Sequence, residues 1–135
     1  MITYKIGNDL AITDVIDVYK DSTFFAKRRP VDDKVRMTEM FENSNLVISA
    51  WSEGELVGIA RALTDFSYTT YLSDLVVRTD YQRQGIGQKL IEQIQAAAPM
   101  AKIVLLAAPQ AAEYYPHIGF EQYHSAWLLR SNKPD

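Results

Sequence analysis

A turn with two glycines carries the clearest chemical signal in this chain. Residues 82–87 read Gln-Arg-Gln-Gly-Ile-Gly, follow an apolar run over residues 71–77, and open a helical pattern over residues 88–98. This order places main-chain N–H groups at the positive end of a helix dipole. Gly85 and Gly87 lack a Cβ, so they can take positive φ and let a ligand approach the main chain. The turn suits a diphosphate, although turns and helix caps also use glycine for structural reasons alone.

The residue types that are missing or rare exclude several other chemistries. The chain has no cysteine, which excludes thiol catalysis, disulfides and thiolate metal sites. Its two histidines, His117 and His124, are not spaced as metal ligands, so we expect no metal. The net charge is -3 with scattered acidic residues. That charge argues against nucleic acid as a partner and is compatible with a cationic or amine substrate.

Length and composition indicate one soluble globular domain. The chain has 135 residues, of which 47% are apolar and 23% are charged. We expect the domain to cover residues 1–130 and a short C-terminal tail to cover 131–135. The first residues have the alternation of a strand, not the pattern of a signal peptide, and no apolar run approaches the roughly 20 residues of a membrane span. The sequence therefore predicts a cytoplasmic protein without a membrane partner.

The elements that must position the glycine turn alternate between strands and helices. Ile86, Leu90 and Ile94 recur at helical spacing after the turn, and the apolar run that follows this helix is typical of a buried strand. Strands are expected at residues 2–6, 46–52, 56–63, 68–77, 103–108 and 121–129. Helices are expected at residues 10–19, 32–43, 88–98 and 110–115, with a loop over 21–30. The order β-α-α-β-β-β-α-β-α-β predicts an α/β fold of the α+β type with a mixed central sheet.

This order, with the glycine turn after the fourth strand, resembles the GNAT superfamily of acetyl-CoA-dependent N-acyltransferases. Residues 72–77, followed by Tyr81, resemble the fourth strand of that family and the turn after it. Residues 82–87 match its pyrophosphate motif Gln/Arg-x-x-Gly-x-Gly/Ala, and residues 114–120, Tyr-Tyr-Pro-His-Ile-Gly-Phe, are similar to its late aromatic-Tyr signature. The motifs stand in the family's order and cover roughly residues 70–124. The first half of the chain agrees only in the order and length of its elements.

The resemblance implies acetyl-CoA as the co-substrate, bound where the fourth and fifth strands splay apart. Main-chain groups of Leu75, Val76 and Val77 would bond the pantetheine amides, and an N–H near Leu75 or Val76 would stabilise an oxyanion. The pyrophosphate would be held by Gln82, Arg83, Gln84, Gly85, Ile86, Gly87, Gln88 and Lys89. The side chains of Arg83 and Lys89 either add charge toward the phosphates or form a solvated surface.

The resemblance also implies two residues for proton transfer. Tyr115 occupies the position where the family often keeps a tyrosine near the coenzyme sulfur, and a phenol with an ordinary pKa near 10 can protonate a departing thiolate. Its alternative role is packing in the core. Asp74 is the nearest carboxylate in sequence to the expected thioester and is a candidate general base, with a hydrogen-bonded strand residue as the alternative. Water alone can also accept the proton of the amine.

The acceptor pocket is expected at the first helix, the loop after it and the middle strands. Its candidate lining residues are Phe24, Phe25, Arg28, Arg29 and Tyr71, with Tyr68 and Trp127 as further positions. Aromatic rings beside arginines can seat an amine with an apolar body and an anionic group. They can equally join a helix to the sheet with the arginines in solvent, which is the more common arrangement.

The leading function is therefore transfer of an acetyl group from acetyl-CoA to a primary amine. Because no cysteine can form an acyl-enzyme, the amine is expected to attack directly in a ternary complex. The alternative is a degenerate member of the family that binds acyl-CoA as a sensor or interaction module. A dinucleotide-binding fold fails because its glycine turn would follow the first strand. The expected partner is a small-molecule amine of unspecified identity, and the resemblance makes a homodimer possible.

Overall fold

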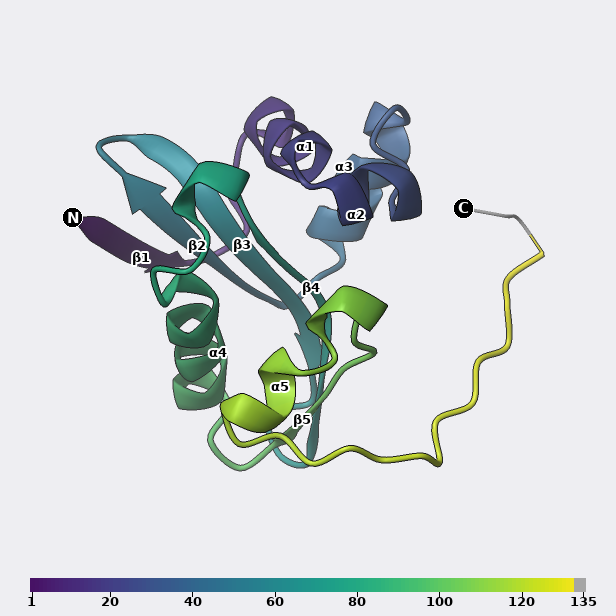
Figure 1. The fold of residues 1–135 in the computed structure, drawn as a ribbon. Helices are drawn as coiled ribbons and strands as arrows, with labels where there is room; N and C mark the ends of the chain where they lie inside the picture. Colours follow the sequence, from purple (N-terminus) through teal and green to yellow (C-terminus); the bar gives the residue numbers. More distant parts are fainter. Residues whose placement is uncertain (133–135) are drawn as a thin grey trace. The chain divides into compact units, whose positions relative to one another are not determined.

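A mixed five-stranded sheet organises residues 1–105 in the computed structural model, which describes residues 1–132 of the chain (Figure 1). The strands lie side by side in chain order, β1 (Ile2–Ile6), β2 (Leu46–Ser52), β3 (Glu55–Thr64), β4 (Thr69–Val77) and β5 (Lys102–Val104). The first four strands pair antiparallel, and β5 joins β4 in parallel. This mixed sheet confirms the fold class that the order of elements predicted.

Helices cover both faces of the sheet. The helices α1 (Ile12–Asp21), α2 (Thr23–Arg28) and α3 (Lys34–Glu42) lie on one face, and α4 (Ile86–Ala97) lies on the other (Figure 1). Apolar side chains of α1 and α3 pack on the strands and form a continuous buried core. Its members include Val15, Val18, Tyr19, Met37, Phe41, Val47, Ile59 and Val76. Removal of these apolar side chains from water is the main contribution to the folding stability of residues 1–105.

The segment expected to be a loop over residues 21–30 contains the short helix α2. Ser22 caps it, because its Oγ accepts the main-chain N–H of Phe25 at 3.3 Å. The N–H of Arg29 closes the last turn on the carbonyl of Phe25. A helix of 6 residues without a fully buried side chain shows no hydrophobic periodicity, so the sequence pattern gave no sign of it.

Gly58 sets the distance between α4 and the sheet. A Cβ at this position would lie 3.3 Å from Ile86 Cγ2 and 3.3 Å from Leu90 Cδ1, both on α4. These distances are shorter than ordinary van der Waals contact. Gly58 also pairs with Val77, the last residue of β4. The missing side chain therefore allows α4 to pack close to the strand pair that leads into the glycine turn.

Replacing Gly58 by valine should destabilise the protein by about 1–3 kcal/mol, because the added methyl groups overpack the contact between β3 and α4. Gly58→Ala adds only the Cβ, so we expect a smaller loss in the same direction. Urea denaturation of the two variants and the unchanged chain measures both losses. An unchanged free energy of unfolding in Gly58→Val would contradict the close packing of α4.

The described residues from Leu106 onward form a second compact unit with short helices. It contains η2 (Pro109–Ala111) and α5 (Tyr114–His117), where the sequence predicted one helix over 110–115. Of the strand expected at 103–108, only β5 forms, and its three residues belong to the first unit.

The strand expected at 121–129 does not form among the described residues, so this prediction was wrong. Alternating apolar residues need a strand edge with which to pair, and residues 106–132 contain no strand. The predicted domain boundary at residue 130 stays a prediction, and residues 133–135 of the expected tail lie outside the described residues. In the described part of the chain, no helix combines the length and the apolar character that crossing a membrane requires.

Candidate active site

The glycine turn lies at the N-terminus of α4, as the sequence predicted. A 3-10 turn, η1 (Thr79–Tyr81), and residues 82–85 connect the end of β4 to α4. Gly85 is the N-cap of α4 with a φ of 81°, and Arg83 has a φ of 63°. Glycine adopts such angles without the steric cost that a Cβ brings. Gly87 lies inside the first turn of α4 and its φ is not positive, so only its missing side chain distinguishes it.

The start of α4 offers main-chain N–H groups to a ligand. The first N–H groups of a helix have no acceptor within the helix. Within residues 1–132, no main-chain carbonyl accepts from the N–H of Gly85, Ile86 or Gly87, and no side chain caps the helix. A Cβ built on Gly85 would meet nothing within 4 Å, so the space beside the turn is open. Donors at the positive end of a helix dipole, next to open space, suit an anionic group.

Two polar side chains of the turn form hydrogen bonds with the main chain just before it. Gln82 Nε2 donates to the carbonyl of Val77 at 3.1 Å, and Gln84 Nε2 donates to the carbonyl of Asp80 at 3.5 Å. Both amides therefore hold the loop against the segment that precedes it. Lys89 Nζ lies 3.7 Å from Glu92 on the next turn of the helix. Direct contact of Arg83, Gln88 or Lys89 with phosphate stays a prediction.

The C-terminal half of α1 holds the segment that leads into the turn. The main-chain N–H of Thr79 donates to Asp21 Oδ2 at 2.7 Å, and Thr79 Oγ1 donates to the carbonyl of Asp21 at 3.3 Å. Arg78 bonds Asp17 Oδ2 and the carbonyl of Leu56, each at 2.8 Å. No local pattern predicts the contacts with Asp17 and Asp21, because they join residues about 60 positions apart.

The edge of β4 is open along most of its length. It pairs with β5 only at Thr69, Thr70 and Tyr71. No strand among residues 1–132 pairs with that edge over residues 72–77. The side chains of Leu72, Asp74 and Val76 are buried, whereas those of Ser73, Leu75 and Val77 are half-buried. An open strand edge offers N–H and C=O groups to an extended ligand.

A β-bulge interrupts β4 along this open stretch. Arg61 of β3 faces Asp74 and the next residue, Ala62, faces Leu72, so Ser73 has no partner on β3. A bulge bends its strand and changes the direction of the main-chain groups around it. The residue pattern of β4 did not predict this bulge.

Asp74, a candidate general base, lies at the centre of a buried charged cluster. Its Oδ2 accepts hydrogen bonds from Tyr19 Oη and Arg61 Nε, each at 2.7 Å. Its Oδ1 accepts from Arg29 Nε at 2.7 Å and from Ser73 Oγ at 3.3 Å. Burial alone would raise the pKa of Asp74, but the charges of Arg61 and Arg29 and their hydrogen bonds lower it. A carboxylate held in this way is a weak proton acceptor, and the geometry favours the alternative role of a hydrogen-bonded strand residue.

Sequence reasoning missed two members of this cluster. Tyr19 occupies an apolar position of α1. Its burial, and to a lesser extent the charge of Asp74, raise its pKa well above 10.0, so its hydroxyl remains a hydrogen-bond donor. Burial would lower the pKa of Arg61, but Asp74 more than offsets this and the pKa is raised. An arginine in the middle of an otherwise apolar strand, such as Arg61, was the available signal for a buried ion pair.

The predicted aromatic-arginine segment divides into an inner and an outer pair. Phe25 lies 5.6 Å from the ring of Tyr19, and the Arg29 guanidinium lies 5.0 Å from the ring centre of Phe25. Since Arg29 also binds the buried carboxylate, this inner pair joins α2 to the sheet. Arg28 is exposed and stacks 4.2 Å from the ring centre of Phe24. Only the outer pair is free to contact a substrate.

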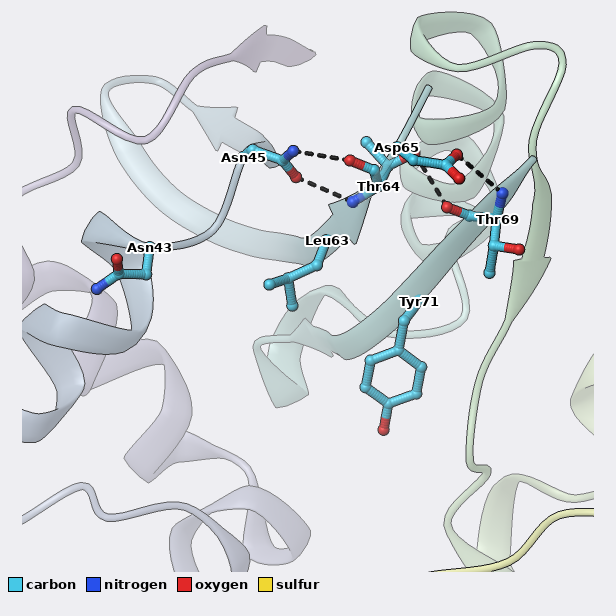
Figure 2. Close-up of a pocket in the computed structure, with 7 residues that line it drawn as sticks. All are labelled: Asn43, Asn45, Leu63, Thr64, Asp65, Thr69 and Tyr71. Atoms are coloured by element: carbon cyan, nitrogen blue, oxygen red, sulfur yellow. Dashed lines mark hydrogen bonds between the residues drawn. The ribbon is translucent and has the colours of Figure 1, made fainter. Parts of the chain in front are cut away.

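Tyr71 lines an open pocket of about 430 Å³ at one end of the sheet (Figure 2). The lining residues are Asn43, Asn45, Leu63, Thr64, Asp65, Thr69 and Tyr71. Leu63 and Tyr71 pair across β3 and β4, and their side chains project to the same side (Figure 2). Tyr71 also pairs with Val104, which is the last position where β4 pairs with β5. The predicted acceptor residue thus stands where the open edge begins.

Asp65 gives this pocket a permanent negative charge. Its Oδ1 accepts main-chain N–H groups of Tyr68 at 2.7 Å, Thr69 at 3.0 Å and Ser67 at 2.9 Å. These bonds lower the pKa of Asp65 to about 2. The carboxylate is therefore ionised at neutral pH, which is compatible with a cationic substrate.

Tyr115 lies in the second unit, where aromatic rings surround it. Its ring centre is 5.3 Å from that of Tyr114 and 5.4 Å from that of Phe120, both in edge-to-face geometry. The side chain is half-buried, and burial, with a smaller contribution from Tyr114, raises its pKa. The phenol is thus protonated at neutral pH, which is the form that a general acid needs.

The two histidines do not form a site. His117 ends α5 and His124 lies in an irregular segment, and both are exposed. Among residues 1–132, no three His, Asp or Glu side chains are placed to hold a metal ion. Trp127, a further position considered for the acceptor pocket, is 95% exposed.

Comparison with known proteins assigns the chain to a family. The family model described as acetyltransferase (GNAT) domain matches residues 17–127. The chain belongs to the GNAT acetyltransferase family. The matched span of this GNAT protein includes β4, the glycine turn and Tyr115, so the three motifs predicted the family correctly.

Individual relatives of this GNAT protein agree with the assignment. An uncharacterized N-acetyltransferase, ycf52, of Gracilaria tenuistipitata var. liui is 33% identical over 97 residues, which are 69% of this chain and 53% of that protein. The solved structure of a GNAT family acetyltransferase from Streptococcus pneumoniae superimposes with a TM-score of 0.74 at 23% identity, over 97% of this chain and 100% of that one. An aminoglycoside N-acetyltransferase solved in complex with CoA has a TM-score of 0.75 at 15% identity, over 98% of this chain and 96% of that one.

These likenesses differ in what they establish for the GNAT protein. The two structural neighbours are less than 25% identical and show the fold alone. The chain spans about half the length of the curated relatives it matches.

Proposed function

We propose that this GNAT protein transfers the acetyl group of acetyl-CoA to a primary amine by direct attack in a ternary complex. One observation carries the proposal: the open edge of β4 leads into a turn whose free N–H groups lie at the start of α4. An extended arm that ends in a diphosphate matches both features at once. CoA has this chemistry, and a structural neighbour was solved with CoA.

The coenzyme would contact main-chain groups at two places. The pantetheine amides would bond N–H and C=O groups around Leu75, Val76 and Val77 on the open edge. The diphosphate would accept hydrogen bonds from the turn and from the first residues of α4. Arg83 and Lys89 are exposed beside this position and would add positive charge. Because the contacts are to the main chain, they depend on the shape of β4 and the turn more than on side-chain identity.

In the proposed reaction, the neutral amine nitrogen attacks the thioester carbon. The C–N bond forms, the carbonyl oxygen becomes an oxyanion, and a main-chain N–H near Leu75 or Val76 stabilises it. The C–S bond then breaks, the sulfur leaves as a thiolate and takes a proton, and the nitrogen loses one. We assign the protonation of the thiolate to Tyr115, whose raised pKa keeps its proton in place at neutral pH. We assign no proton to Asp74, so water accepts the proton of the amine.

Replacing Tyr115 by phenylalanine should lower kcat by about 10²–10³-fold and leave CoA affinity within about twofold, because only the proton donor is removed. Steady-state kinetics with the best amine measures kcat, and calorimetry measures CoA affinity. Tyr114→Phe is the matched control, since it removes the neighbouring phenol. Turnover of Tyr115→Phe at the rate of the unchanged protein would remove the acid role.

The acceptor is a small-molecule amine in this proposal, seated near Tyr71 and the outer pair of half-buried Phe24 and exposed Arg28. The pocket beside Tyr71 carries the ionised Asp65, which supports a cationic compound. Cytoplasmic location and a homodimer remain predictions. The alternative is a family member that binds acyl-CoA without turnover as a sensor.

The test of this function is thermal stability with acetyl-CoA, with CoA and ATP as comparisons, followed by thiol release across a panel of amines. A rise in Tm with acetyl-CoA and thiol release with one amine class is the expected result. A rise in Tm without turnover on any amine would favour the sensor. The absence of any rise in Tm would contradict the coenzyme assignment itself.

A further inference from the structure

The bulge on β4 is held by two arginine side chains. Ser73 has no partner on β3, so the antiparallel ladder does not fix it. Its carbonyl accepts a hydrogen bond from Arg29 Nη2 at 3.0 Å, and its hydroxyl accepts one from Arg61 Nη2 at 2.8 Å. The position of the extra residue therefore depends on these side chains.

Arg29 reaches the bulge with its whole guanidinium engaged. Nε donates to Asp74 Oδ1 at 2.7 Å, Nη1 donates to the carbonyl of Arg28 at 2.8 Å, and Nη2 donates to the carbonyl of Ser73. The planar fork of arginine has fixed donor directions, so these three bonds determine the orientation of the group. Its plane also lies over the ring of Phe25, which is packed against the core. Arg29 thus links α2 to β4, so the placement of α2 affects the position of the bulge.

The location of the bulge decides how the next residues present their main chain. An extra residue on one strand changes which N–H and C=O groups face the neighbouring strand and which face the opposite edge. Asp74 follows Ser73 and pairs with Arg61, and Leu75 and Val76 continue this regular pairing with Ala60 and Ile59 of β3. Their main-chain groups are those assigned above to the thioester and the oxyanion. A shift at Ser73 would change their direction toward the open edge.

We propose that Arg29 is a positioning residue for the reaction. It fixes the bulge through the carbonyl of Ser73 and so aims the N–H groups after it at the thioester carbonyl. This inference rests on the proposed function, because it requires acetyl-CoA on the open edge of β4. It changes the role of a residue that the sequence suggested would contact the amine.

Variants of Arg29 can remove its positioning role without leaving the buried carboxylate of Asp74 unpaired. Removing Arg29 leaves Asp74 paired with Arg61 and bonded to Tyr19, so the buried charge keeps a partner. Arg29→Met retains most of the apolar stem and removes all donors. Arg29→Lys retains the charge but not the fork. Lys27→Met is the matched control, because Lys27 is an exposed cation on α2.

The experiment is isotope-edited infrared spectroscopy of acetyl-CoA carrying ¹³C in the thioester carbonyl, bound to each variant. A hydrogen bond from the main chain lowers the stretching frequency of this carbonyl, and the measurement needs no amine and no turnover. Calorimetry of CoA binding and steady-state kinetics with the best amine accompany it. Folding of each variant is verified by urea denaturation.

In the unchanged protein and in Lys27→Met, we expect the carbonyl frequency to lie below that of free acetyl-CoA. In Arg29→Met and Arg29→Lys, it should move back toward the free value and kcat should fall by about tenfold or more, with CoA affinity within about twofold. A frequency in Arg29→Met equal to that of the unchanged protein would overturn the positioning role alone. Failure of the unchanged protein to bind acetyl-CoA would overturn the proposed function, and this inference with it.

Discussion

Replacing Gly85 by aspartate should weaken CoA binding by about 100-fold, which corresponds to roughly 2.7 kcal/mol. The aspartate would add a carboxylate beside the N–H groups assigned to the diphosphate, and like charges at close range repel. It would also occupy these donors, because a carboxylate at a helix N-cap accepts from the first N–H groups. Calorimetric titration with CoA measures the loss directly.

The matched control for this prediction is Gly85→Asn. Asparagine has nearly the same shape and tolerates positive φ as well as aspartate does, but it carries no charge. A Cβ at this position meets nothing within 4 Å, so neither variant should disturb the packing of α4, and the backbone strain at a φ of 81° is common to both. Asparagine can cap the same N–H groups, so we expect Gly85→Asn to lose less CoA affinity than Gly85→Asp, and the difference between the two variants measures the effect of the charge. Equal affinity of Gly85→Asp and the unchanged protein would contradict the assignment of the diphosphate to this turn.

Replacing Asp74 by alanine should lower the free energy of unfolding by about 3–5 kcal/mol, because it leaves buried guanidinium groups without their counter-charge. Arg61 is 8% exposed, and both its Nε and Tyr19 Oη lose a bond of 2.7 Å. Urea denaturation measures the loss. Asp32→Ala is the control, because that exposed carboxylate forms a surface pair with Lys20 and its loss should change stability by less than about 0.5 kcal/mol.

The same ion pairs give a pH dependence with a definite sign. The pKa of Asp74 is lowered in the folded protein, so the unfolded chain binds the proton first as the pH falls. The contribution of Asp74 to stability is then complete above the ordinary pKa of aspartate and disappears as the pH falls through the lowered value. The difference between the unchanged protein and Asp74→Ala should therefore shrink in acid. If Asp74→Ala instead kept its stability and lost only turnover, the general-base hypothesis would regain support.

Together these two predictions distinguish a residue that binds the ligand from a residue that stabilises the structure around the site. Gly85 acts by leaving donors and space open at the start of α4, so its replacement should change affinity and leave the fold intact. Asp74 acts by joining α1, the end of α2, β3 and β4 through one carboxylate. Its replacement should change stability first and catalysis only as a consequence.

Local signals were sufficient for the elements around the coenzyme site. The glycine turn was predicted from Gly85 and Gly87 between an apolar strand and a helical pattern, and it lies at the start of α4. The residue pattern over 46–77 correctly predicted three strands, and the structure pairs them antiparallel. Patterns of this kind depend on neighbours in the chain, which is why they are visible without the fold.

Local patterns did not predict two elements correctly, because contacts with other parts of the chain decide whether these elements form. The apolar alternation over residues 121–129 predicted a strand, but a strand also requires a ladder of hydrogen bonds to a neighbouring strand, and these residues form none within residues 1–132. The helix α2 was overlooked for the opposite reason. A single cap at Ser22 and contacts of Phe25 stabilise it, and neither produces a periodic pattern.

The sequence by itself determined the family, the order of the five strands and of the helices α1, α3 and α4, and the place of the turn, because each rests on residues adjacent in the chain. Only the tertiary structure decided the roles of Asp74 and Arg29. From the sequence, Asp74 was a candidate base and Arg29 a candidate substrate contact, yet they bind each other across 45 positions in sequence. Burial makes an unpaired charge costly, so partners that only the fold brings together determine what each charged group does.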